Sequence, residues 1–225
     1  MTLSLPVLFS SLLTTFFATA FFAPAAAPEV IRLPQPLSDG AMSMEKTLRQ
    51  RRSMRQYKNQ PVTLSDLSQL LWAAQGVSGP GDRRTAPSAG ALYPLEVSVV
   101  AGNVTGLSAG TYSYDPDQHQ LTVIAEGDAR RSLSRAALDQ SSIKNAAAVL
   151  VLCAVYERTT VKYGERGIRY VHMEAGHAAQ NVSLQAVALN LGTVVIGAFH
   201  DDRVRTVLRL SEQEHPLSLM PIGRK

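Results

Sequence analysis

The sequence has little cysteine and few aromatic residues, and it lacks the common metal-binding motifs. A single cysteine, Cys153, among 225 residues excludes an internal disulfide and a cysteine-based zinc site. Aromatic residues make up 6% of the chain and do not alternate with basic ones, which argues against a nucleic-acid partner. No HExxH motif occurs, and His172 and His177 are five residues apart, on different faces of a helix, so we expect no metal site.

The composition is that of a folded domain without a common nucleotide-binding motif. GxGxxG and P-loop patterns are absent, which argues against a Rossmann or kinase-like domain, and no GxSxG elbow occurs. The chain is 45% hydrophobic and 18% charged, so it can bury a core. Its net charge of +4 suits an anionic ligand, although the same charge would also favour solubility. Cys153 lies in the apolar run AAAVLVLCAVY, which predicts a small buried side chain.

The N-terminal segment 1–28 carries no charged side chain and contains a long apolar run. This pattern predicts an export signal, with ATA at 18–20 as a cleavage site. No Lys or Arg precedes the run, however, and the run is long enough to cross a bilayer. An uncleaved anchor and a misassigned start therefore remain alternatives to a signal peptide. We expect a bacterial protein that is exported, either periplasmic or membrane-anchored.

The remaining sequence predicts an extended lead-in at 29–42 and one α+β domain at 43–225. Helix signals are clearest at 63–76, where Thr63 and Asp66 form a capping-box pattern and Gly76 is a stop. Alternating or continuous apolar residues predict an antiparallel or mixed sheet, flanked by helices, with a long central helix. The expected strands are 95–102, a hairpin within 110–127, 145–156, 193–199 and 216–223. The other expected helices are 43–52, 128–140, 166–192 (closed by Gly192) and 201–210 (capped by Asp201).

The segment RRSMRQY, residues 51–57, is the densest basic stretch of the chain. Arg51, Ser53 and Arg55 could point one way while Arg52 points elsewhere. Two guanidinium groups and a hydroxyl that converge on one point match a phosphate group. A solvated basic face on a surface helix is the alternative for this segment taken alone.

Two further segments carry candidate chemistry. Small residues in TAPSAGALYP (85–94) would let backbone N–H groups approach a flat ligand, although the composition also fits an ordinary loop. In VKYGERGIRY, Lys162 and Tyr163 are adjacent, and a lysine can lower the pKa of a neighbouring tyrosine or serve as acid or base when desolvated. The alternative is a pair of surface side chains ahead of a helix.

Taken in this order, the segments resemble the nitroreductase-like flavoproteins over about residues 44–224. RRSMRQY, APSAGALYPLEV, KYGERGIRYVHMEAGHAAQN, IGAF and PIG carry the resemblance, which is closer to the SagB/McbC-type dehydrogenases, a subgroup that includes thiazoline and oxazoline oxidases. The resemblance implies a nitroreductase-like α+β fold. It also implies FMN bound at the interface of a homodimer.

The resemblance also implies the roles of individual residues. Arg51, Ser53 and Arg55, in a cluster with Arg52, would hold the phosphate, the ribityl chain and the pyrimidine edge of the flavin. Pro87, Ser88 and Ala89 would line the ring from the partner subunit. Gly197 would lie close to the isoalloxazine, and Gly223 and Arg224 near the phosphate. Lys162 and Tyr163 match a catalytic pair that transfers protons in azoline-oxidising members.

The expected function is that of an FMN-dependent oxidoreductase that transfers hydride between a donor and an organic acceptor. A positive group near the pyrimidine edge would stabilise the reduced flavin. The substrate is left open among an azoline-bearing peptide, a nitroaromatic, a quinone or another small molecule. The alternative is a flavin-binding carrier or sensor with the same fold and no catalysis. We expect no nucleic-acid partner, and a membrane only if the N-terminal segment is uncleaved.

Overall fold

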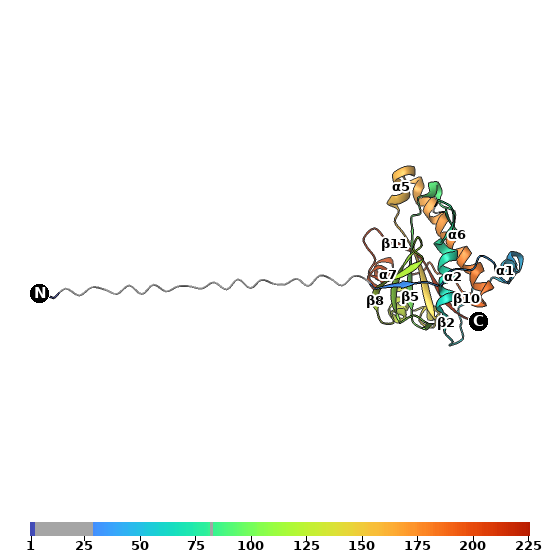
Figure 1. Cartoon of the computed structure of the whole chain (residues 1–225), viewed down its shortest axis with the longest axis horizontal. Coiled ribbons are helices and arrows are strands. Elements are labelled where there is room, and N and C mark those ends of the chain that lie inside the picture. Colours follow the sequence, from blue (N-terminus) through green and yellow to red (C-terminus); the bar gives the residue numbers. More distant parts are fainter. Residues whose placement is uncertain (3–28, 82) are drawn as a thin grey trace.

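The computed structural model describes residues 1–2, 29–81 and 83–225 (Figure 1). The export signal or anchor predicted for residues 1–28 therefore lies almost entirely outside the described residues. In the described part, a seven-stranded sheet forms the centre of the domain, in the order β1-β8-β7-β5-β9-β11-β10 with every neighbouring pair antiparallel. Its strands are β1 (Val30–Arg32), β5 (Leu95–Ala101), β7 (Gly110–Asp115), β8 (Gln120–Glu126), β9 (Ala148–Ala154), β10 (Leu191–Thr193) and β11 (His215–Arg224).

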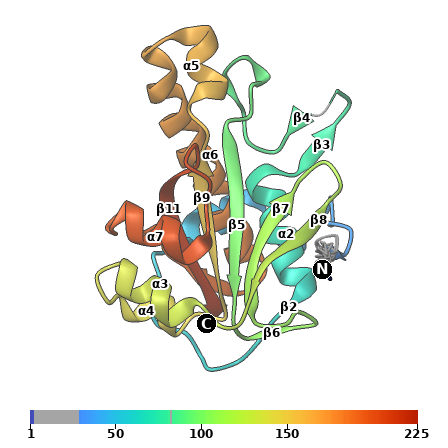
Figure 2. The ribbon, with the colours of Figure 1, turned by 90° about the vertical axis from the view of Figure 1, so that its left-hand side faces the viewer.

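Helices cover both faces of this sheet (Figure 2). One face packs against α2 (Leu64–Gln75) and α6 (Arg166–Ala188), and the other packs against α3 (Arg130–Ala136), α4 (Ser141–Lys144) and α7 (Asp201–Leu208). Every residue of β9 is buried, because this strand lies mid-sheet between the two helical layers. Burial on both faces of the sheet explains why the run around Cys153 is continuously apolar. Cys153 itself is a buried free thiol, and desolvation raises its pKa.

The remaining elements are short. They are α1 (Met44–Gln50), α5 (Glu157–Tyr163), the 3-10 turn η1 (Ala89–Ala91) and the strand pairs β2 (Val62–Thr63) with β6 (Val104–Thr105) and β3 (Val77–Gly79) with β4 (Arg83–Arg84). In Figure 1, α5 and the first turns of α6 extend beyond one end of the sheet, while α1 lies against the other end of α6. The domain thus has two well-separated ends joined by α6.

The structure confirms the α+β class, the antiparallel sheet and the long helix, and it corrects several details. The lead-in is extended as expected, but its first residues form the edge strand β1. Helix α6 ends at Ala188, and Asn190 in a left-handed conformation follows it, so Gly192 belongs to β10 and does not close the helix. The strand expected at 193–199 is mostly irregular after Thr193. The N-cap residue of α7 is His200, which makes no side-chain cap, so Asp201 is not the cap. The sequence did not predict α4 and α5.

The described helices include none long and apolar enough to cross a membrane. Within the described ranges, no group of three or more His, Cys, Asp or Glu side chains is placed to hold a metal ion.

Candidate active site

The arginine segment, residues 51–57, follows α1 and runs beside β10 and β11 at one edge of the sheet. Ser53 forms a parallel bridge with Thr193, and the N–H of Met54 donates to the carbonyl of Thr193 at 2.8 Å. Just beyond the segment, Lys58 forms an antiparallel bridge with Arg224. The backbone therefore brings the arginine segment together with the end of β11, which lies at the opposite end of the domain in sequence.

Glycine makes this close approach of the segment to the sheet feasible. A Cβ atom at position 223 would lie 2.5 Å from Cγ of Tyr57, and one at position 192 would lie 3.3 Å from Cε1 of the same ring. Gly192 and Gly223 are paired across β10 and β11, so the Tyr57 ring lies over a pair of glycines. The Tyr57 hydroxyl donates to the carbonyl of Met54 at 2.7 Å, and burial raises its pKa. Gly223 is thus needed for packing the arginine segment against the sheet.

Arg51, Arg52, Arg55 and Arg224 differ in whether their guanidinium groups already have partners. Arg51 and Arg55 make no ion pair with the described residues. Arg52 donates to the carbonyls of Arg49 and Arg51, at 3.0 and 2.7 Å, and so covers the end of α1. Arg224 pairs with Asp66, its Nη2 lying 2.5 Å from Oδ2. Two of the predicted phosphate ligands are therefore uncommitted, while Arg52 and Arg224 already have partners.

Two further features at the β10 edge of the sheet leave groups free to contact a ligand. The hydroxyl of Thr193, beside Ser53, is buried and has no hydrogen-bond partner among the described residues. Gly197 is exposed, and a Cβ there would meet nothing within 4 Å, so a flat ligand could approach its backbone. The hydroxyl and the backbone of Gly197 are therefore available to a ligand at this edge.

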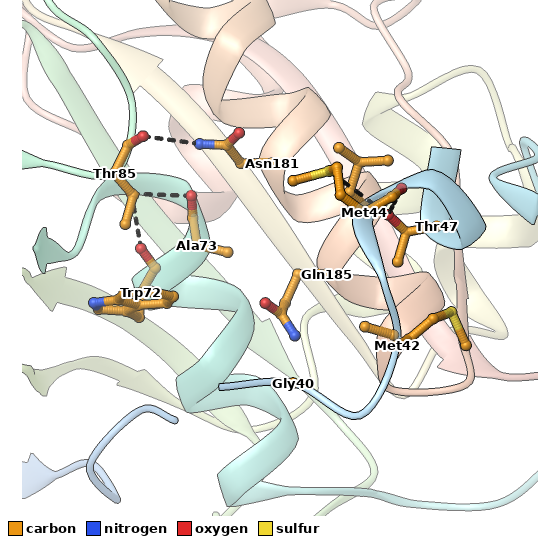
Figure 3. A pocket seen from close by; sticks show the side chains of 11 residues that line it. Gly40, Met42, Met44, Thr47, Trp72, Ala73, Thr85, Asn181 and Gln185 are labelled. Atoms are coloured by element: carbon orange, nitrogen blue, oxygen red, sulfur yellow. Dashed lines mark hydrogen bonds between the residues drawn. The ribbon is translucent and has the colours of Figure 1, made fainter. Parts of the chain in front are cut away.

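The glycine loop, residues 85–94, has an unusual backbone. Gly90, Ala91 and Tyr93 all have positive φ, at 65°, 53° and 45°. The hydroxyl of Thr85 donates to the carbonyls of Trp72 and Ala73, at 2.9 and 3.0 Å, and Nδ2 of Asn181 donates to the carbonyl of Thr85 at 3.2 Å (Figure 3). Non-glycine residues with positive φ are strained. They persist where the surrounding structure holds them, which is common at functional sites.

Pro87, Ser88 and Ala89 occupy the middle of this loop, and the predicted catalytic pair lies against it. Pro87 is exposed, and Ser88 and Ala89 are half-buried. A Cβ at Gly90 would lie 2.8 Å from the hydroxyl of Tyr163 and 3.0 Å from Nζ of Lys162. These two residues come from the last turn of α5, a helix that the sequence did not predict. The structure therefore brings Lys162 and Tyr163 to the glycine loop, although four strands of the seven-stranded sheet, β5, β7, β8 and β9, separate them from it in sequence.

Within one chain, the two groups of predicted residues are far apart. The glycine loop contacts α6 and lies near Glu174, whereas the arginine segment lies beyond the end of α6, at Thr193. From Glu174 to Ala188 the helix rises about 21 Å at 1.5 Å per residue.

The pocket drawn in Figure 3 is distinct from both groups. It has a volume of about 320 Å³ and lies between the lead-in, α1, α2 and α6. Met42, Trp72 and Gln185 are among its lining residues, and none of the predicted site residues line it. We assign no ligand to it.

Sequence reasoning missed one residue with a strongly altered environment. Glu174 on α6 is 2% exposed, and burial raises the pKa of its carboxyl group to about 7. Ser88 and Gln75, through hydrogen bonding, and the charge of Arg84 oppose this increase. The available signal was position: Glu174 falls on the buried stripe of α6, between Val171 and Ala178, where a carboxyl group is unusual.

The comparisons with known proteins identify the class of protein. The nitroreductase family model matches residues 48–224, so the chain belongs to the nitroreductase family. The nitroreductase-type protein MJ1384 of Methanocaldococcus jannaschii is 48% identical over 184 residues, which are 82% of this chain and 92% of that protein. A solved nitroreductase-type structure from Ralstonia eutropha has a TM-score of 0.75 and 32% identity, covering 87% of this chain and 89% of that one.

The peptide-processing branch of the family is also similar. The microcin B17-processing protein McbC of Escherichia coli is 32% identical over 68% of this chain, and the match spans 58% of McbC. The solved E. coli microcin synthetase complex McbBCD, with truncated pro-MccB17 bound, has a TM-score of 0.67 and 27% identity over 94% of this chain and 84% of that one. The resemblance to the SagB/McbC-type proteins is thereby confirmed, and the protein is an oxidoreductase of the nitroreductase family.

Proposed function

We propose that this protein is a homodimeric, FMN-dependent oxidoreductase that transfers hydride between a donor and an organic acceptor. The observation that carries the proposal is the pairing of Ser53 with Thr193 at the end of the sheet, because Thr193 has an unpaired buried hydroxyl and Arg51 and Arg55, two residues to either side of Ser53 in sequence, make no ion pair with the described residues. Such a set of donors fits a dianionic phosphate. FMN, when bound, would supply the two-electron acceptor and donor chemistry of the reaction.

In this proposal, the arginine segment binds the cofactor and the glycine loop covers it from the other subunit. Arg51, Ser53 and Arg55 hold the phosphate, the ribityl chain and the pyrimidine edge, and Gly197 leaves room for the ring. Pro87, Ser88 and Ala89 of the partner subunit line the opposite side. Gly223 and Arg224 complete the phosphate end, where Arg224 would share its charge between Asp66 and the ligand.

The surface of the chain supports association with a second copy. Ile168 and Met173 on the outer face of α6 are 42% and 54% exposed, and Met44 and Leu48 on α1 are 60% and 52% exposed. The two pairs lie at opposite ends of α6, and exposed apolar side chains of this kind are a usual feature of protein interfaces. The separation of the two residue groups within one chain supports the same conclusion, since a dimer would reunite them.

Lys162 and Tyr163 are the proposed catalytic residues for proton transfer. Both lie at the edge of the glycine loop, which this proposal places beside the flavin. The ammonium group of Lys162 lies 5.5 Å from the centroid of the Tyr163 ring, so the two side chains lie close together beside the loop. A lysine and a phenol in this position could release or accept the proton that accompanies hydride transfer.

The substrate is proposed only as a class. An organic acceptor, either a small molecule or a peptide, fits a site that two subunits would form. The similarity to McbC, whose name records processing of microcin B17, favours testing azoline-bearing peptides alongside nitroaromatics and quinones.

We also propose that the protein is exported or membrane-anchored, on the basis of the uncharged apolar run within segment 1–28. The test is fractionation of bacterial cells that express the full chain, with mass spectrometry of the N-terminus. Intact protein in the cytosolic fraction would contradict this proposal.

The absorbance spectrum of protein expressed from residue 29 tests the cofactor proposal. We expect the bands of oxidised flavin, release of FMN on denaturation and a dimer by light scattering. A chain that is colourless and stays so after incubation with excess FMN would contradict it. Reduction trials with NADH, NADPH and dithionite would then identify the electron donor.

A further inference from the structure

Arg158, in the first turn of α5, binds two other parts of the chain through its guanidinium group. Its Nη1 donates to the carbonyl of Tyr93 in the glycine loop at 3.1 Å, and its Nη2 pairs with Oε1 of Glu96 on β5. These partners lie 65 and 62 positions away in sequence. Figure 2 shows α5 beside the end of β5 at which the loop joins that strand. The side chain of Arg158 therefore connects α5 directly to the glycine loop.

The same face of α5 carries Lys162, which follows Arg158 by about one helical turn. Residues four positions apart in an α-helix lie on one face. A Cβ atom at Gly90 would lie 3.0 Å from Nζ of Lys162 and 2.8 Å from the hydroxyl of Tyr163. Arg158 bonds to the loop three residues further along, at the carbonyl of Tyr93. This face of α5 thus follows the glycine loop from Gly90 to Tyr93.

Tyr93 is the residue of the loop on which these contacts converge. Its φ is 45°, a strained value for a residue with a side chain. Its N–H donates to Oγ of Ser88 at 3.0 Å, and the Arg84 guanidinium lies 4.6 Å from the centroid of its ring. With Arg158 at the carbonyl, three different side chains contact the N–H, the ring and the carbonyl of Tyr93. Arg158 is therefore bonded to a part of the loop that is itself held in place.

Helix α5 depends on contacts with the rest of the chain for its orientation. It has seven residues, and an isolated helix of that length is not stable in water. Just before it, the N–H of Val155 donates to the carbonyl of Pro94 at 2.8 Å. At its end, the rings of Tyr163 and Tyr170 are 5.2 Å apart between centroids, in an edge-to-face arrangement. Between these two attachments, Arg158 supplies the side-chain hydrogen bond that joins α5 to the glycine loop.

The ion pair of Arg158 with Glu96 is not placed to add much stability. The two side chains are 42% and 27% exposed, and ion pairs so accessible to water contribute little to folding. A guanidinium group bound to two acceptors nonetheless has a defined orientation, because its donors lie in one rigid plane. Glu96 therefore orients Arg158 toward the carbonyl of Tyr93 more than it stabilises the fold.

We propose that Arg158 is a positioning residue of the active site, which holds α5, and with it Lys162 and Tyr163, at a fixed place on the glycine loop. The inference rests on the proposed function, because that function assigns proton transfer to Lys162 and Tyr163 and places the loop beside FMN. Arg158 acts through geometry alone. A displacement of about 1 Å at a reacting centre can reduce a rate about 100-fold, so the attachment of α5 to the loop matters for catalysis.

Hydrogen exchange of the FMN-free protein tests this attachment without cofactor or substrate. Arg158→Gln removes the guanidinium group, and Arg158→Lys keeps the charge but not the two-pronged geometry. We expect the hydrogen-bonded amides of Tyr93 and Gly164 to exchange at least fivefold faster in both variants, with β5 and β9 unchanged. Arg166→Gln is the matched control, because Arg166 is an exposed arginine at the start of α6 that makes no ion pair with the described residues.

The outcome of the exchange measurement is decided by the comparison of these variants. Exchange at the wild-type rate in Arg158→Gln, or the same acceleration in Arg166→Gln, would overturn the inference. Arg158→Lys decides the question if Arg158→Gln does not fold.

Reoxidation of the reduced flavin provides the second measurement. The probe reaction is the oxidation of dithionite-reduced enzyme by menadione, a small quinone, which needs no nicotinamide. We expect Arg158→Gln to lower the limiting rate at least tenfold while FMN affinity stays within threefold of wild type, and Arg166→Gln to match wild type in both. In a Lys162→Ala/Tyr163→Phe background, Arg158→Gln should add less than threefold, since it acts through that pair. Independent, multiplicative effects would overturn the inference.

Failure of the proposed function gives a different result from failure of this inference. A wild-type protein that binds no FMN, or a Lys162→Ala/Tyr163→Phe variant that reacts like wild type, would contradict the proposed function. The exchange measurement would still decide whether Arg158 holds α5 on the glycine loop.

Discussion

The arginine segment and the glycine loop are held in place by different means. Backbone pairing fixes the first, through the bridges Ser53–Thr193 and Lys58–Arg224. Side chains fix the second, through the hydroxyl of Thr85, the amide of Asn181 and the hydroxyl of Ser88. Side-chain substitutions should therefore change ligand binding at the arginine segment without moving it, whereas at the glycine loop they should change the conformation itself.

The largest effect is expected from the double substitution Lys162→Ala and Tyr163→Phe. Both groups lie beside the glycine loop, and neither belongs to the arginine segment that would bind FMN. Turnover should fall roughly 10²–10⁴-fold, the usual contribution of general acid–base catalysis, while bound FMN is retained. Steady-state kinetics and the flavin absorbance of the same sample give both values. Unchanged turnover would remove the pair from catalysis, and a protein that turns over nothing in either form would favour a carrier or sensor.

At the arginine segment we expect a loss of cofactor affinity without loss of stability. Arg51→Gln with Arg55→Gln removes two uncommitted guanidinium groups and should weaken FMN binding about 100-fold, because a hydrogen bond to a charged group contributes roughly 1.5–3 kcal/mol. The matched control is Arg52→Gln, since Arg52 already donates to carbonyls at the end of α1. Fluorescence titration with FMN measures both. A loss in Arg52→Gln that is half as large in free energy as the loss in the double variant would show that only net charge matters.

The sequence predicted the fold better than it predicted the site. Capping at Thr63 and Asp66, the stop at Gly76 and the buried strand around Cys153 depend on nearby residues, and all three are present. The pairing of residues 51–58 with β10 and β11 was not visible, because it depends on the path of the backbone through the whole sheet. Helix α5 was missed because ERTTVKY has no apolar stripe, and it is stabilised by packing against α6.

The roles of individual polar residues were also beyond local patterns. The sequence grouped Arg52 with Arg51 and Arg55, but only the fold shows that Arg52 serves the end of α1. Arg224 was expected near a phosphate. In the structure it pairs with Asp66, a capping residue of α2 that lies 158 positions away in sequence. The burial of the Glu174 carboxyl group was not predicted. It follows from the approach of α2 and the glycine loop to α6, which the local sequence does not show.

Stability should respond differently at two glycines, one beneath the arginine segment and one on the exposed face of α6. Gly223→Ala places a Cβ 2.5 Å from the Tyr57 ring, so the segment or β11 must shift, and we expect a loss of about 3 kcal/mol in unfolding free energy. Gly176→Ala meets nothing within 4 Å and should add roughly 0.5–1 kcal/mol through helix propensity. Urea denaturation of the FMN-free proteins measures both changes. A loss at Gly176 in the dimer, but not in dilute monomer, would show that a second chain covers this face.

Glu174 should also contribute a pH dependence to the stability of the folded chain. Its pKa is about 7 in the folded protein and near the ordinary glutamate value of 4.5 when exposed, so between these values the folded state binds more protons than the unfolded state. The stability contributed by protonation is thus complete below about pH 4.5 and is lost as the pH rises through 7. Glu174→Gln cannot ionise, so its stability relative to wild type should increase by roughly 1–3 kcal/mol from pH 4.5 to 8, with the upper bound set by the size of the pKa difference. Urea denaturation across this range gives the difference, from which the contributions of the histidines and other carboxyl groups cancel. A constant difference would mean that the carboxyl group of Glu174 has the same pKa in the folded and unfolded states.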